Sequence, residues 1–98
     1  MKIIIFGIGN FGASLSMQLS EMGHEVIAID KNPDKVEMIK DQVTHTICLD
    51  STNLVALRSL PLRDTDVAIV GIGENEGASI LTTANLKTLG VPREISRS

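Results

Sequence analysis

The sequence predicts an α/β domain built on a doubly wound parallel sheet. Apolar runs of strand length alternate with helical patterns along the chain, which is typical of parallel strands joined by right-handed helical crossovers. The first apolar run also meets a Gly-x-Gly-x-x-Gly motif, and a helical pattern follows the motif at once. Together these features predict a Rossmann-like fold, and the length of 98 residues suits one domain, residues 1–98.

The first strand is expected at residues 2–6 and the first helix at residues 11–22. The helix carries Leu15, Leu19 and Met22 at helical spacing, and a glycine follows as the stop. This spacing predicts one apolar face, which an amphipathic helix packs against the sheet.

The later elements continue the alternation. Asn32, Pro33 and Asp34 predict a helix start, because Asn caps, Pro suits the first turn and Asp complements the helix dipole. The apolar strand expected at residues 66–70 suits the centre of a parallel sheet. The sheet is expected to be truncated after the fifth strand, whose edge is then exposed or covered by a partner chain. The remaining elements are expected as strands at 25–30, 44–49 and 91–97 and as helices after Asn32, up to Leu57 and at 77–89.

The composition excludes several classes of protein. A net charge of −3 gives no basic surface for nucleic acid, and an aromatic content of 2% argues against base stacking. No apolar run approaches the roughly 20 residues of a membrane span, so a cytoplasmic domain is expected. The single cysteine, Cys48, fits a reducing compartment, and its place in a strand predicts a small buried residue.

The glycine motif predicts a phosphate-binding turn. Gly7 permits the tight turn after the strand, Gly9 lets a pyrophosphate approach the backbone, and Gly12 lets the helix pack closely on the strand. The helix N-terminus then offers N–H groups and the positive end of its dipole to the phosphates. The motif is completed by Ile8, Asn10 and Phe11.

A carboxylate at the end of the second strand supports the same interpretation. Asp30 follows the last glycine by about 20 residues, the spacing at which an acidic side chain accepts hydrogen bonds from a ribose hydroxyl. Such a carboxylate would repel the 2′-phosphate of NADP. Asp30 is also consistent with a cap for the next helix, and Lys31 follows it at the same strand end.

Further polar residues follow the other strands, at the edge where ligands bind in sheets of this kind. Each group has a plain alternative, since the turns also suit chain reversal and the arginine also suits a solvated charge. The residues alone leave these alternatives open. The candidates are Asp50, Ser51 and Thr52 after the third strand, Ile72, Gly73 and Glu74 after the fourth, and Arg97 after the fifth.

The sequence shows no catalytic or metal-binding constellation. His24 and His45 fall at the opposite edge of the predicted sheet, and the chain has no tyrosine to donate a proton. Two distant histidines and one cysteine make no metal cluster. The sequence therefore predicts nucleotide binding without catalysis.

In this order the motifs resemble the N-terminal nucleotide-binding domain of Trk/Ktr potassium-uptake regulatory subunits, the TrkA-N or RCK type. The resemblance covers essentially the whole chain. The similar stretches are Gly-Ile-Gly-Asn-Phe-Gly, Met22-Gly23-His24-Glu25-Val26 leading into Asp30, Asp50-Ser51-Thr52, and Ile72-Gly73-Glu74-Asn75 before a Thr-rich helix.

The resemblance implies a regulatory domain that is not an enzyme. It implies binding of NAD(H) or of ATP, ADP or AMP, with Asp30 at the ribose, the Asp50-Ser51-Thr52 turn as a second contact and Arg97 at the phosphates. Asn10 stands where the Ktr branch often has Arg, which gives less reason to prefer a triphosphate. The implied partners are a second copy in a homodimer, an octameric ring as the larger assembly, and a membrane potassium-translocating subunit at the inner face of the cell membrane.

Other functions stay open at this point. The main alternative is the NAD-binding fragment of a dehydrogenase, which would need an acid–base residue from a substrate domain. A self-association domain with a vestigial pocket and a methyltransferase that uses S-adenosylmethionine are further alternatives.

Overall fold

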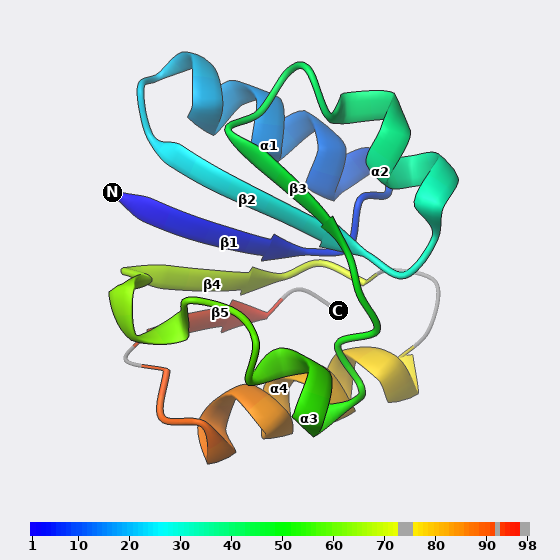
Figure 1. The fold of residues 1–98 in the computed structure, drawn as a ribbon, viewed down its shortest axis with the longest axis vertical. Helices are drawn as coiled ribbons and strands as arrows, with labels where there is room; N and C mark the ends of the chain where they lie inside the picture. The colour runs from blue at the N-terminus through cyan, green and yellow to red at the C-terminus, as the bar shows by residue number, and fades with distance from the viewer. Residues whose placement is uncertain (73–75, 92, 97–98) are drawn as a thin grey trace.

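The chain forms a five-stranded sheet in which each pair of neighbouring strands is parallel (Figure 1). A computed structural model describes residues 1–72, 76–91 and 93–96. The strand order is β3-β2-β1-β4-β5, so the chain crosses back over the sheet between β3 and β4. The predicted doubly wound fold is confirmed. The strands are β1 (Lys2–Phe6), β2 (Glu25–Asp30), β3 (His45–Cys48), β4 (Val67–Val70) and β5 (Glu94–Ser96).

Helices cover both faces of the sheet (Figure 1). α1 (Asn10–Glu21) and α2 (Pro33–Ile39) lie on one face, whereas α3 (Leu54–Leu57) and α4 (Glu76–Thr88) lie on the other. A 3-10 helix, Leu62–Asp64, precedes β4. Within the described residues, no helix is long and apolar enough to cross a membrane.

The central strands bury side chains on both faces, because successive residues of a strand point to opposite sides. In β1, Ile4 and Phe6 join the apolar cluster on the side of α3 and α4. Ile3 and Ile5 join the cluster on the side of α1 and α2. All four side chains are at most 4% exposed. This two-sided burial explains why the sequence shows continuous apolar runs instead of an alternating pattern.

α1 packs closely through small residues. Gly12 and Ser16, about one turn apart, are its buried residues, and Leu15 and Leu19 are partly buried against the sheet. Met22 is 70% exposed, so its expected place on the packed face is wrong. The reason is its position, because Met22 is the C-cap of α1 and follows the turns that contact the sheet.

β3 lies at the edge of the sheet, and this overturns the prediction of a buried Cys48. Its sheet neighbour is β2, and none of its four residues is buried. Cys48 is exposed, and its Sγ donates to the carbonyl oxygen of Lys31 at 3.4 Å. Burial of a strand residue depends on the place of its strand in the sheet, which a short apolar run does not reveal.

The other predicted elements form at the expected places, and most ends shift by a residue or two. The fifth strand differs more, since the structure gives Glu94–Ser96 where 91–97 is expected. The 3-10 helix after Pro61 was not predicted.

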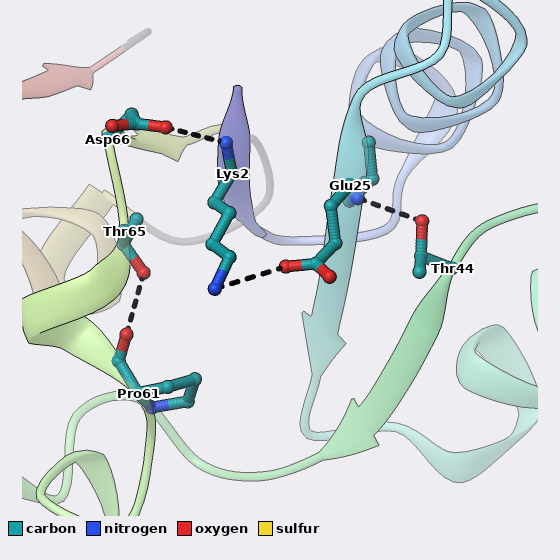
Figure 2. A network of polar contacts seen from close by, with 7 residues as sticks. Lys2, Glu25, Thr44, Pro61, Thr65 and Asp66 are labelled. Carbon is teal, nitrogen blue, oxygen red and sulfur yellow. Dashed lines mark hydrogen bonds and ion pairs between the residues drawn. The ribbon is translucent and has the colours of Figure 1, made fainter.

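Side chains at the amino edge of the sheet fix the starts of neighbouring strands (Figure 2). Asp66 Oδ2 accepts from the Lys2 N–H at 2.7 Å, and Thr44 Oγ1 accepts from the Val26 N–H at 3.0 Å. Lys2 Nζ also lies 3.8 Å from a Glu25 carboxylate oxygen. These contacts join β1 and β2 to each other and to the segments before β3 and β4, at the edge opposite the glycine motif.

We predict that Gly12→Ala strongly destabilises the domain. A Cβ at this position would lie 1.8 Å from the Gly7 carbonyl oxygen, which is a backbone atom and cannot rotate away. Overpacking of this kind costs about 2–3 kcal/mol, which should lower the thermal midpoint by roughly 10–20 °C. Thermal unfolding followed by circular dichroism measures the shift, and an unchanged midpoint would contradict the proposed contact.

Candidate functional site

The glycine motif forms a tight turn between β1 and α1. Gly7 has a φ of 101° and its N–H donates to the Ile29 carbonyl oxygen at 2.7 Å. A Cβ on Gly7 would lie 2.9 Å from the Gly71 carbonyl oxygen, so two strand-end turns meet here without room for a side chain. Gly9 differs, because a Cβ on it would meet nothing within 4 Å. The tight turn at Gly7 and the close packing of α1 at Gly12 agree with the prediction from the sequence. The approach of a pyrophosphate to Gly9, which has open space beside it, stays a prediction.

The N-cap residue of α1 is Gly9, which has no side chain to cap the helix. No acidic residue occupies the first turn of α1. By contrast, Asn32 caps α2 and Asn53 caps α3 through their side-chain oxygens. The N-terminus of α1 and the positive end of its dipole therefore face the carboxyl edge without a carboxylate from the first turn and without a side chain on the N-cap residue.

Asp30 ties the glycine turn to the end of β2. Its Oδ2 accepts from the Ile8 N–H at 2.8 Å, and its Oδ1 accepts from the Asn32 N–H at 2.9 Å. The cap of α2 is Asn32, whose Oδ1 accepts from the Asp34 N–H at 2.9 Å, so Asp30 does not cap that helix. A carboxylate has about four lone-pair positions, so Asp30 retains capacity for two further donors.

The turn after β3 carries a second carboxylate. Asp50 Oδ1 accepts from the Thr52 hydroxyl at 2.6 Å and from the Thr52 N–H at 3.0 Å. These two bonds hold the pKa of the Asp50 carboxyl below its ordinary value, the hydroxyl contributing more than the N–H. Ser51 points the other way: its side chain is buried, with its Oγ 2.7 Å from the Thr82 Oγ1.

These elements surround a cavity of about 720 Å³ at the carboxyl edge of the sheet, a usual size for a small-molecule site. Ile8 and Gly12 do not line it and act through the contacts described above. Gly73, Glu74 and Arg97 lie outside the residues that the structure describes. The predicted residues that line the cavity are Gly7, Gly9, Asn10, Phe11, Asp30, Lys31, Asp50, Ser51, Thr52 and Ile72.

Several lining residues were not predicted. Lys35 in α2 and Lys31, which precedes that helix, both line the cavity, so two lysines border it. No local pattern in the sequence marks Lys35 for this position. A Cβ on Gly71 would lie 2.9 Å from the Phe11 ring, a packing requirement that no local pattern reveals. The unpredicted lining residues are Ile29, Asn32, Lys35, Leu49, Gly71, Ala78 and Leu81.

Both histidines lie away from the cavity. His24 immediately precedes β2, and its Nδ1 is 3.1 Å from the amino group of Met1, whereas His45 is the first residue of β3. In the described part of the chain, no group of three His, Cys, Asp or Glu side chains could hold a metal ion. The arrangement is suited to holding an anionic ligand with hydroxyl groups.

Comparison with known proteins identifies relatives of this chain. The chain is 48% identical over 90 residues to the Ktr system potassium uptake protein C of Bacillus subtilis (strain 168), covering 92% of this chain and 41% of that protein. It is 42% identical over 91 residues to the Ktr system potassium uptake protein A of the same organism, covering 93% and 41%. The chain thus spans about two fifths of the length of these relatives.

A solved structure agrees on the fold. The NAD(P)-binding domain of an exopolyphosphatase-related protein from Archaeoglobus fulgidus superposes with a TM-score of 0.88 at 24% identity, covering 98% of this chain and 71% of that one. The family of the TrkA-N domain matches residues 3–97, which is almost the entire sequence. The chain therefore belongs to the TrkA-N domain family.

Proposed function

We propose that this domain binds a nucleotide, NAD(H) or an adenosine phosphate, and regulates potassium uptake as part of a longer protein. The observation that carries the proposal is the cavity lined by both the N-terminal turn of α1 and Asp30, whose carboxylate accepts from the Ile8 N–H. The relatives named as potassium uptake proteins support the biological setting.

The ligand groups follow from the two kinds of polar atom at the cavity. A pyrophosphate is placed at Gly9, where the backbone is accessible and the dipole of α1 favours negative charge. A ribose is placed at Asp30, whose remaining lone pairs can accept from two hydroxyl groups. From the sequence we also assign Arg97 to the phosphates, and we take the Asp50-Ser51-Thr52 turn, Gly73 and Glu74 as further candidate contacts to the nucleotide.

The charges favour some nucleotides over others. Asp30 would repel a 2′-phosphate, so NADP is excluded from the proposal. Asn10 in the first turn of α1 is neutral, so its side chain offers no positive charge to a third phosphate. We therefore expect NAD(H), ADP or AMP to bind at least as tightly as ATP.

Regulation requires that the ligand binds two states of the protein with different affinity. We assign the domain to a homodimer, assembled further into an octameric ring, that contacts a potassium-translocating membrane subunit at the inner face of the membrane. The role is binding and not catalysis. A dehydrogenase fragment is the weaker alternative, since relatives at 42–48% identity are named as potassium uptake proteins.

We predict that NAD(H) and ADP stabilise the domain and that NADP does not. Ligand at about 100 times its Kd should add roughly 2.7 kcal/mol, or about 10–20 °C in a thermal-shift measurement. Asp30→Asn should weaken NAD(H) binding by roughly ten- to a hundredfold, because a charge-assisted hydrogen bond is lost. The same change should reduce the difference in affinity between NAD and NADP, because the carboxylate that repels the 2′-phosphate is gone. No shift with any nucleotide would contradict the proposal.

We predict that Gly9→Ala abolishes most nucleotide binding while leaving the domain folded. The new Cβ meets open space in the protein, and the φ of −83° is allowed for alanine, so the cost to stability should stay near 1 kcal/mol or below. The same methyl group occupies the place of the pyrophosphate and should raise the Kd at least about tenfold. Calorimetry measures the Kd, and Gly12→Ala serves as the contrasting variant that loses stability first.

We predict that the regulatory role shows in cells carrying the full-length protein. Gly9→Ala in its TrkA-N domain should change the rate of potassium uptake at a normal protein level, because the nucleotide can no longer shift the equilibrium between states. Uptake of a potassium analogue such as rubidium measures the rate. Wild-type uptake despite lost nucleotide binding would refute the regulatory role and leave the binding role intact.

A further inference from the structure

One face of α4 lines the cavity and also forms hydrogen bonds to the turn after β3. Ala78 and Leu81 line the cavity, while Thr82 and Asn85 contact the turn after β3. These four positions follow the i, i+3, i+4, i+7 spacing of a single helix face. Ile80, on a different face, is 71% exposed.

The contacts from α4 to the turn are three hydrogen-bonded pairs. Thr82 Oγ1 lies 2.7 Å from Ser51 Oγ, and both side chains are buried, at 0% and 7% exposure for the residues. Asn85 Nδ2 donates to the carbonyl oxygens of Ser51 at 3.3 Å and Thr52 at 3.1 Å. Buried polar groups that lose such partners are costly, so these bonds constrain where the turn can lie.

The hydroxyl groups of Thr82 and Thr88, both in α4, have different kinds of hydrogen-bond partner. The Thr88 hydroxyl donates to the Ala84 carbonyl oxygen, four residues back, at 3.1 Å, which is the common behaviour of threonine within a helix. The Thr82 hydroxyl instead bonds across to a residue 31 positions away. Thr82 therefore holds tertiary structure, whereas Thr88 bonds within its own helix.

The turn needs such support. Asp50 and Thr52 bond to each other, which shapes the turn without fixing it to the rest of the domain. The Leu49 N–H donates to the Asp30 carbonyl oxygen at 3.0 Å and fixes the start of the turn to β2. Ser51 and Thr52, which follow Asp50, are fixed by α4.

We propose that Thr82 and Asn85 are positioning residues that hold the Asp50-Ser51-Thr52 turn in its nucleotide-binding position. The inference rests on the proposed function, since it assigns the turn to the nucleotide site. When the turn leaves that position, the apparent affinity falls in proportion to the competent fraction. The coupling is reciprocal, so a bound nucleotide stabilises the contact of the turn with α4.

The test compares variants of α4 in the full-length protein. Thr82→Val removes the hydroxyl at nearly constant volume, Thr82→Ser restores a hydroxyl, and Thr88→Val is the matched control on the same helix. Amide hydrogen exchange of residues 50–53 in the ligand-free protein reports the position of the turn. Calorimetry with NADH and ADP gives the Kd.

We expect Thr82→Val to speed exchange at residues 50–53 and to raise the Kd, each by roughly tenfold, the change that loss of one buried hydrogen bond produces. Thr82→Ser should recover most of both effects, and Thr88→Val should match wild type. If Thr82→Val fails to fold, Asn85→Ala replaces it, because Asn85 is only half-buried; we expect a smaller loss of affinity in the same direction.

A purely structural role for Thr82 would lower the thermal midpoint and leave the Kd and the exchange of the turn at wild-type values. That result would overturn the inference alone. Failure of the wild-type protein to bind any nucleotide would overturn the proposed function, and with it the inference.

Discussion

The packing of α1 against the turn after β1 is the constraint on which the carboxyl edge depends. The two backbones approach so closely that Gly12 has no room for a Cβ next to the Gly7 carbonyl oxygen. This approach fixes where α1 begins and directs its uncapped N-terminus at the cavity. Gly7 in turn lies against Gly71, so the end of β4 is held to the same point. Close backbone packing at these three glycines therefore fixes the positions of the turns that carry the polar groups of the cavity.

The polar groups around the cavity include both positive groups and negative groups. The dipole of α1 and the ammonium groups of Lys31 and Lys35 provide positive potential, while Asp30 and Asp50 provide acceptors. Asp50 remains a carboxylate to lower pH than an ordinary aspartate, because Thr52 donates to it through both its hydroxyl and its N–H. Phosphates and sugar hydroxyls are the ligand groups that match such a mixture.

Much of this arrangement could be predicted from the sequence because its signals are local. The glycine spacing, the apolar strand before it and Asp30 at the end of the next strand each report on backbone within a single β-α-β unit. Cys48 could not be placed correctly, because its exposure depends on β3 being an edge strand. Thr82 and Asn85 were missed for a related reason, since their partners lie more than 30 positions away and ordinary helix threonines and asparagines look the same.

The strand order has a consequence for how the protein acquires its cavity. β4 pairs with β1 in the register Ile3 to Val67, so β1 waits for a segment that is made more than 60 residues later. Non-local pairing of this kind closes slowly, because the chain entropy is lost before the contact is gained. Gly71 reaches Gly7 only with that pairing. A chain interrupted before β4 would carry the entire glycine motif and still lack the wall of the cavity that Gly71, Ile72, Ala78 and Leu81 provide, so the cavity exists only in the completely folded domain.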